Sequence, residues 1–185
     1  MSFDVIDTPI PGLKIIQRES FHDDRGFLTR LYCDDNFKLI GIDKPIRQIN
    51  QTNTKKKGTL RGMHFQRPPF AEIKLVSCIR GKIFDVAVDL RKNSPTFLKW
   101  HGEVLSQTNQ RSFLIPEGFA HGFQALTDNC ELIYLHTAPY SREFEDALNL
   151  MDKKLDITWP LKIFNLSKRD QSHPIIKNDF EGIIL

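Results

Sequence analysis

Histidine is the residue type best suited to moving protons near neutral pH, and four of the six histidines have surroundings that allow chemistry. His64 and His121 each have a glycine within two positions, and glycine inside a strand often marks a close approach of backbone or ligand. His136 stands in a largely apolar run, and two aspartates that follow His22 predict its exposure. A single histidine is more often structural or solvated, so the glycines make His64 and His121 the stronger candidates.

Two other polar residues stand inside apolar runs. Lys74 follows Ile73 and begins an otherwise apolar strand, although lysines are seldom buried without a partner. It is either an edge lysine or one that points into the interior of the fold. Tyr134 lies among leucine and isoleucine, so it is either a core tyrosine with a satisfied hydroxyl or an acid whose partner the sequence does not reveal.

The elements that must position these side chains are short strands. In residues 82–90 the large apolar residues Phe84, Val86, Val88 and Leu90 alternate with smaller or polar ones, which predicts a strand with one face in a core. Further runs, separated by Gly, Asn, Asp and Pro, cover residues 13–16, 26–33, 46–52, 59–65, 74–79, 97–105, 112–115, 122–126 and 131–137. Short helices are predicted at residues 34–39 and 167–171. This pattern indicates an all-β antiparallel sandwich or barrel, whose mouth is a common place for ligands.

A barrel of this kind could hold a metal. Metal-binding cupins usually carry a His-x-His pair, a later Glu and a distant His, but here Gln66 stands where the second histidine of the pair belongs. His64, Glu72 and His121 could still supply three ligands, which is the number typical of a catalytic metal site. A metal-dependent cupin enzyme is therefore the alternative, and a site without metal is the expectation.

Composition narrows the class of protein. The 185 residues suit one domain spanning residues 1–185, and a hydrophobic fraction of 40% can form a core. The net charge of +3 is too small to indicate nucleic-acid binding. No apolar stretch reaches the ~18 residues of a membrane span, and the N-terminus lacks the features of a signal peptide. Three widely spaced cysteines predict reduced thiols and a cytoplasmic location.

Several motifs, taken in order, resemble one family. They are DRGF (24–27), LRGMHFQ (60–66), FDVAVDLR (84–91), SPTF (94–97), IPEGFAHGF (115–123), the spacing Tyr134-x-x-Thr137-x-x-Tyr140, ITWP (157–160) and LSKRD (166–170). In order and spacing they are similar to dTDP-4-dehydrorhamnose 3,5-epimerases from about residue 7 to residue 175. The resemblance departs from the family at Arg30, where a glutamate is common, and at Leu150, where a tryptophan is usual.

The resemblance implies an isomerase that works by proton transfer. A keto group at sugar C4 acidifies the neighbouring C–H bonds at C3 and C5. By resemblance, His64 is the base and Asp170 orients it, because a carboxylate behind an imidazole fixes its tautomer. Lys74 would stabilise the enolate charge, and Tyr134 would return a proton on the opposite face of the sugar.

The resemblance also implies the binding residues and the assembly. The diphosphate of a nucleotide-linked keto-sugar would meet cationic side chains, Tyr140 and Phe27 would stack on the base, and the remaining residues would contact the ligand. The implied binding set is Arg25, Phe27, Gln48, Asn50, Arg61, His121, Tyr140, Glu145 and Arg169. A cupin-like jelly-roll barrel, no cofactor, and a homodimer that lends N-terminal strand residues to its partner's site complete the expectation.

Overall fold

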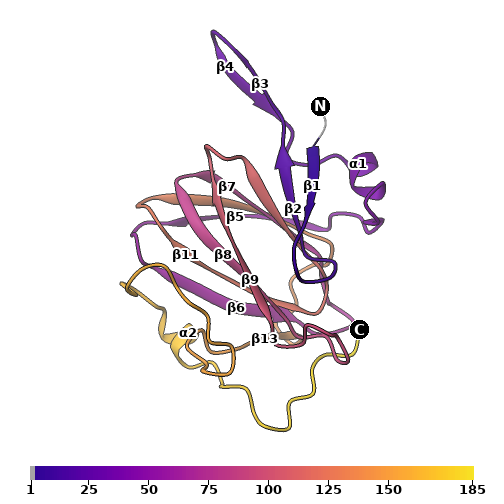
Figure 1. Cartoon of the computed structure of the whole chain (residues 1–185), viewed down its shortest axis with the longest axis vertical. Helices are drawn as coiled ribbons and strands as arrows, with labels where there is room; N and C mark the ends of the chain where they lie inside the picture. Colours follow the sequence, from indigo (N-terminus) through magenta and orange to yellow (C-terminus); the bar gives the residue numbers. More distant parts are fainter. Residues whose placement is uncertain (1–2) are drawn as a thin grey trace.

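The computed structural model describes residues 3–185 and consists mainly of two antiparallel sheets (Figure 1). The six-stranded sheet contains, in spatial order, β1 (Phe3–Asp7), β2 (Lys14–Arg18), β10 (Arg111–Ile115), β7 (Lys74–Arg80), β12 (Cys130–His136) and β5 (Gln48–Thr54). The five-stranded sheet contains β13 (Glu145–Ala147), β6 (Leu60–Gln66), β11 (Phe119–Ala125), β8 (Lys82–Asp89) and β9 (Trp100–Ser106). The predicted all-β antiparallel architecture is confirmed.

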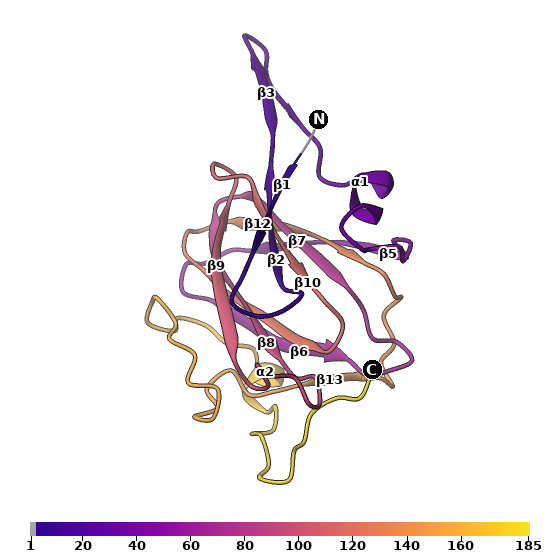
Figure 2. The same cartoon turned by 45° about the vertical axis from the view of Figure 1, so that its right-hand side comes forward.

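A third, two-stranded sheet stands apart from the other two. Strands β3 (Ser20–Asp23) and β4 (Gly26–Thr29) form a hairpin. Both views show this hairpin projecting away from the rest of the molecule (Figures 1 and 2). The sequence predicted one strand over residues 26–33, whereas β4 ends at Thr29 and the chain then turns toward helix α1 (Asp34–Lys38).

Strand β8 shows how the alternating pattern is used. Val86 and Val88 pack with the C-terminal segment in a cluster that covers the outside of the five-stranded sheet. Ile83 and Ala87, on the other face, belong to the core between the two sheets. The predicted apolar face is therefore buried, but the face with smaller residues is buried as well, because it lines the interior between the sheets.

The C-terminal segment places the second helix next to strand β6 of the five-stranded sheet. Leu155 and Ile176 anchor the segment in the outer cluster of the five-stranded sheet. Between them, helix α2 (Lys168–Gln171) begins after Ser167, whose hydroxyl accepts a hydrogen bond from the backbone N–H of Asp170 at 3.0 Å. This capping fixes the short helix and the direction of the Asp170 side chain.

Neither α1 nor α2 has the length and apolar character of a membrane-spanning helix within the described chain.

Candidate active site

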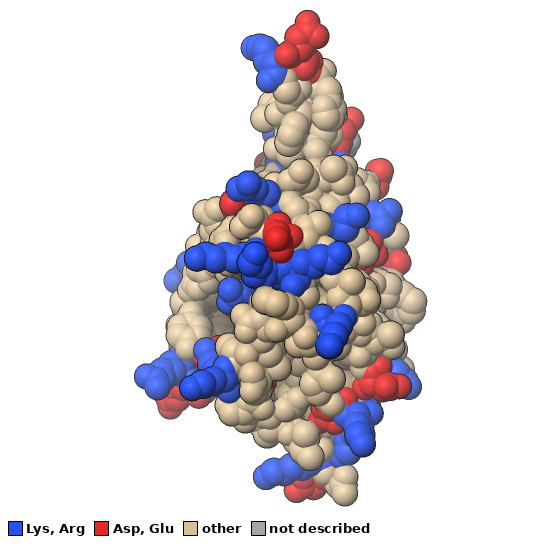
Figure 3. Space-filling model, turned by 90° about the vertical axis from the view of Figure 1, so that its left-hand side faces the viewer, with Lys and Arg blue, Asp and Glu red and all other residues tan. Residues whose placement is uncertain are grey.

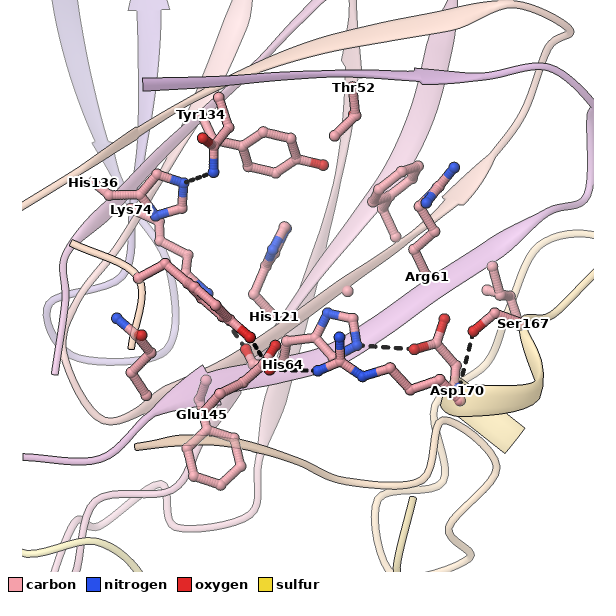
Figure 4. Close-up of a pocket in the computed structure, with 18 of the residues that line it drawn as sticks. Thr52, Arg61, His64, Lys74, His121, Tyr134, His136, Glu145, Ser167 and Asp170 are labelled. Carbon is pink, nitrogen blue, oxygen red and sulfur yellow. Dashed lines mark hydrogen bonds and ion pairs between the residues drawn. The ribbon is translucent and has the colours of Figure 1, made fainter. Parts of the chain in front are cut away.

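A cavity of about 430 Å³ opens between the two sheets. Eleven of the thirteen residues predicted to act on or bind a ligand line it, and Figure 4 shows the labelled ones pointing into a common space. The eleven are His64, Asp170, Tyr134, Lys74, Gln48, Asn50, Arg61, His121, Tyr140, Glu145 and Arg169. Residues more than one hundred positions apart are thus gathered at one site.

An imidazole and a carboxylate form the centre of this cavity. The Nε2 atom of His64 lies 2.9 Å from Oδ1 of Asp170. Burial raises the pKa of Asp170, but the hydrogen bond and charge of His64 and the bond to Ser167 outweigh it, so the pKa falls below the ordinary value. The ionised carboxylate can only accept, so Nε2 carries the proton and Nδ1 of His64 keeps a free lone pair.

A β-bulge in strand β6 aims two side chains into the cavity. On β11, His121 pairs with His64 and Phe123 pairs with Arg61, so β6 has one extra residue over this interval. Arg61 and His64, three positions apart, therefore both reach the cavity. A Cβ atom at Gly62, where φ is +139°, would lie 2.5 Å from the Cα of Gly122, so the predicted close approach is one of backbone to backbone.

Tyr134 faces His64 from the opposite wall. His64 lies on β6 of the five-stranded sheet and Tyr134 on β12 of the six-stranded sheet. Figure 4 shows the two rings projecting into the cavity from different sides. Burial raises the pKa of the Tyr134 phenol, so the hydroxyl stays protonated at neutral pH and can donate a proton. A flat molecule between the sheets would present one face to each residue.

Lys74 is neither an edge lysine nor free in the cavity. Its Nζ atom lies 3.1 Å from Oε1 of Glu72 and donates to the carbonyl of His64 at 3.4 Å. The other carboxylate oxygen of Glu72 lies 2.8 Å from Nδ1 of His136, whose Nε2 is 3.4 Å from the amide nitrogen of Asn50. Burial raises the pKa of Glu72, but the charge of Lys74 and the bond to His136 lower it below its usual value. The ammonium is thus held at the cavity wall.

His121 forms a second imidazole–carboxylate pair, deeper than the first. Its Nε2 atom lies 2.6 Å from Oδ1 of Asp85, and both side chains are buried. Burial raises the pKa of Asp85, an effect that the charge of His121 partly offsets. The face of β8 with smaller residues thus supplies a carboxylate that the sequence did not single out.

One end of the cavity carries an ion pair and an aromatic ring. Arg169 lies 2.5 Å from Glu145, and the Tyr140 hydroxyl donates to the same carboxylate at 2.8 Å. Burial raises the pKa of Glu145, and the hydrogen bonds from Arg169 and Tyr140 lower it below its ordinary value. Arg61 donates to the Thr54 hydroxyl at 3.1 Å.

Lys and Arg side chains also gather on one face of the molecule beside a hollow (Figure 3).

Gln48 and Asn50 lie two positions apart on strand β5, so both side chains are on the face that lines the cavity. The Gln48 amide donates to the side-chain oxygen of Asn50 at 3.2 Å, and the Gln48 oxygen accepts from the backbone N–H of Tyr140 at 2.8 Å. These hydrogen bonds hold the two amides in place at the cavity rim. Both residues were predicted to contact the ligand.

Arg25 and Phe27 are the two predicted residues that the structure does not bring to this chain's cavity. Both belong to the projecting β3–β4 hairpin, where Arg25 pairs with Asp23 at 2.5 Å and the Phe27 side chain is largely exposed. They can contribute to a site only if the hairpin reaches another molecule.

The alternative metal set does not come together. His64 bonds Asp170, His121 bonds Asp85, and Glu72 lies against Lys74. Among residues 3–185, the group of three side chains whose ligand atoms lie close together is His64, Asp170 and His173. This group contains neither Glu72 nor His121.

The model of the dTDP-4-dehydrorhamnose 3,5-epimerase family matches residues 7–178. The chain belongs to this family. A dTDP-4-dehydrorhamnose 3,5-epimerase from Salmonella typhimurium is 43% identical over 174 residues, covering 93% of this chain and 94% of the relative. The predicted class, an isomerase, is thereby confirmed.

Solved structures of the family have the same fold. A dTDP-4-dehydrorhamnose 3,5-epimerase from Bacillus anthracis, with TDP and PPi bound, aligns with a TM-score of 0.91 at 38% identity, covering 95% of this chain and 100% of that one. A 3'-monoepimerase from Streptomyces bikiniensis, in complex with dTDP-quinovose, aligns with a TM-score of 0.85 at 31% identity, covering 91% and 85%. The cupin-like fold is confirmed, and the family contains both double and single epimerases.

The two predicted departures from the family pattern, Leu150 and Arg30, lie outside the cavity lining. Leu150 is 2% exposed and packs in the outer cluster of the five-stranded sheet, so this departure concerns packing. Arg30 follows β4 and is exposed.

The sequence did not predict a role for His173, whose ring meets that of His64 edge-on at 5.5 Å between centroids. His173 lies two residues beyond the end of α2, so no helical spacing linked it to Asp170 in the sequence.

Proposed function

We propose that this epimerase converts dTDP-4-dehydro-6-deoxyglucose to dTDP-4-dehydrorhamnose by inverting C3 and C5. The observation that carries the proposal is the placement of His64 and Tyr134 on opposite sheets of one cavity. Inversion requires that a proton leave one face of the sugar and arrive on the other, and two residues on one wall could not do this.

The reaction begins with removal of a proton from carbon. Nδ1 of His64 takes the proton from the C–H bond next to the C4 ketone, and the electron pair moves onto the C4 oxygen to give an enolate. Asp170 holds the imidazole in the tautomer that leaves Nδ1 basic and stabilises the imidazolium that forms. The Lys74 ammonium stabilises the negative oxygen.

Reprotonation completes the inversion. The Tyr134 hydroxyl gives its proton to the opposite face of the same carbon, and the enolate returns to a ketone. Proton exchange with solvent restores the neutral imidazole and the phenol. The same cycle at the second carbon yields the double epimer, and no oxidant, reductant or cofactor enters the balance.

Binding of the nucleotide diphosphate uses the remaining cavity residues. Arg61, Arg169 and His121 meet the phosphates, and Tyr140 stacks on the base. Gln48, Asn50 and Glu145 complete the contacts. Residues 1–185 act as one domain, in the cytoplasm, where the three unpaired cysteines stay reduced.

The projecting hairpin gives the reason for a homodimer. Phe21, Phe27 and Leu28 are each at least half exposed on it, and apolar side chains gathered this way mark an interaction surface. A second copy of the chain inserts its hairpin at the cavity mouth and supplies the Arg25 and Phe27 that each cavity lacks.

Proton NMR of dTDP-4-keto-6-deoxyglucose in deuterium oxide tests the reaction. Wild-type protein should remove both the C3 and C5 proton signals, and His64→Asn should remove neither. Loss of one signal would make the protein a single epimerase, and loss of neither in wild type would refute the proposed substrate.

Subunit mixing tests the homodimer. His64→Asn and Arg25→Ala, each impaired alone, should regain roughly a quarter of the wild-type rate when mixed and allowed to exchange, because half of the dimers then contain one intact site. No recovery, with exchange verified, would show that each hairpin does not serve the partner's cavity.

A further inference from the structure

A second histidine approaches the carboxylate of Asp170. The Nε2 atom of His173 lies 3.3 Å from Oδ1 of Asp170, the same oxygen that lies 2.9 Å from Nε2 of His64. The three ligand atoms all lie within 4.8 Å of one another. Two ring nitrogens and a carboxylate oxygen therefore lie close together beside the cavity.

The His173 nitrogen has no hydrogen-bond partner although it is buried. Buried polar atoms are nearly always paired, so an orphaned one calls for an explanation. The proton-transfer mechanism supplies none, because it uses only His64 and Asp170 of this group. The distance to Asp170 is short, but the angles do not make a hydrogen bond.

The donor set suits a divalent transition metal. Zn²⁺ binds imidazole nitrogen and carboxylate oxygen at about 2.0–2.2 Å, and a site with two histidines, one carboxylate and a fourth open position is typical of it. Neighbouring ligands of a tetrahedral ion at that range lie about 3.3 Å apart. The observed separations of 2.9 and 3.3 Å between Asp170 and the two histidines come close to this value, and the two histidine nitrogens lie within 4.8 Å of each other.

We propose that His64, Asp170 and His173 form a binding site for Zn²⁺ or a similar transition-metal ion, and that an ion bound there inhibits the enzyme. The His64 side chain is 33% exposed, whereas Asp170 and His173 are 7% and 13% exposed. The open coordination position therefore faces the cavity next to His64.

Inhibition follows from the tautomer of His64. In the metal-free enzyme Nε2 donates to Asp170 and the lone pair of Nδ1 is the base. An ion on Nε2 needs the lone pair of that atom, so the proton of the neutral ring moves to Nδ1. A protonated Nδ1 cannot accept a proton from carbon. The ion would also take Asp170 away from its role behind the imidazole.

Binding is tested without any reference to activity. Chelator-treated wild-type protein is titrated with Co²⁺, whose visible absorption reports coordination by nitrogen and oxygen, and then with Zn²⁺ as a competitor. We expect one ion per chain. Loss of an outer partner alone costs about 10- to 100-fold in metal affinity, so His173→Gln should weaken binding at least about tenfold. His101→Gln, on strand β9 and outside the cavity, is the matched control and should bind as wild type does.

Equal affinity of wild type and His173→Gln would overturn the site, as would the absence of binding up to about millimolar metal, the weak end of protein–ligand affinities. Thermal unfolding of each variant without metal verifies that it is folded.

The inhibitory part rests on the proposed function and has its own readout. Zn²⁺ should stop deuterium exchange by wild type, and a chelator should restore it. His173→Gln should need at least about tenfold more Zn²⁺ for half-inhibition of its own zinc-free rate. Zinc that binds without slowing exchange would refute the inhibition. If the metal-free wild type shows no exchange, the proposed reaction fails, and the binding result stands separately.

Discussion

Replacing Asp170 with asparagine alters one side-chain atom in the cavity and changes what His64 can do. The carboxylate Oδ1 lies 2.9 Å from Nε2 of His64 and accepts a hydrogen bond from it. An amide in the same position can turn its NH₂ toward Nε2 and donate instead. The imidazole then carries its proton on Nδ1, which is the nitrogen proposed to act as the base.

The size of the effect follows from two contributions. A hydrogen bond to a charged group is worth about 1.5–3 kcal/mol, which is roughly 10- to 100-fold in rate if it is lost as the imidazolium forms. The wrong tautomer adds to this, and the same replacement in serine proteases lowers kcat by about 10⁴. Asp170 is 5% exposed, so water cannot replace the carboxylate. We expect exchange at C3 and C5 to slow by about 10³–10⁴, equivalent to about 4–5.5 kcal/mol.

The assay is deuterium incorporation into the keto-sugar, followed by NMR at saturating substrate. Asp146→Asn is the matched control, because the Asp146 carboxylate also accepts a side-chain hydrogen bond, from Arg67 at 2.7 Å, but lies outside the cavity lining. It should exchange as wild type does. A rate for folded Asp170→Asn within about fivefold of wild type would refute the tautomer argument, since the charged hydrogen bond alone predicts more.

Three further predictions concern neighbouring groups. Tyr134→Phe should lower epimer formation by at least about 10², because the acid on the far wall is lost; product analysis would contradict this if the epimer still forms at the wild-type rate. Lys74→Gln should lower kcat by about 10²–10³, since the enolate loses its cation, and steady-state kinetics with an unchanged kcat would rule that role out. The folded pKa of Glu72 lies below its ordinary value, so its contribution to stability is present above about pH 4.3 and is lost as pH falls through the folded pKa. Melting temperatures measured from about pH 6 to pH 3.5 should therefore fall more steeply for wild type than for Glu72→Gln, and parallel curves would contradict the shift.

The strands were predictable where alternation is strong. Residues 82–90 alternate clearly, and β8 spans Lys82–Asp89. Strand β13 was missed because its three residues form a strand only through pairing with β6, which no local pattern encodes. Strand β11 begins at Phe119, three residues before the predicted start, because its pairing with β8 extends past the turn signal.

The family and the identities of most cavity residues could be read from the motifs, because short runs in fixed order are highly specific. Their partners could not. Glu72 was considered as a metal ligand, yet the fold places it between Lys74 and His136. Asp85 was seen as one polar residue in a strand, yet it holds His121 from inside the barrel.

By itself, the sequence determined an all-β epimerase of this family and predicted His64 as its base, because residue type and local order carry that information. Only the tertiary structure decided which groups meet. It placed His64 and Tyr134 on opposite sheets, put His173 beside Asp170, and left Arg25 and Phe27 on a hairpin away from the cavity. Such contacts depend on the register of strands distant in sequence and on the path of the C-terminal segment, and neither has a local signature.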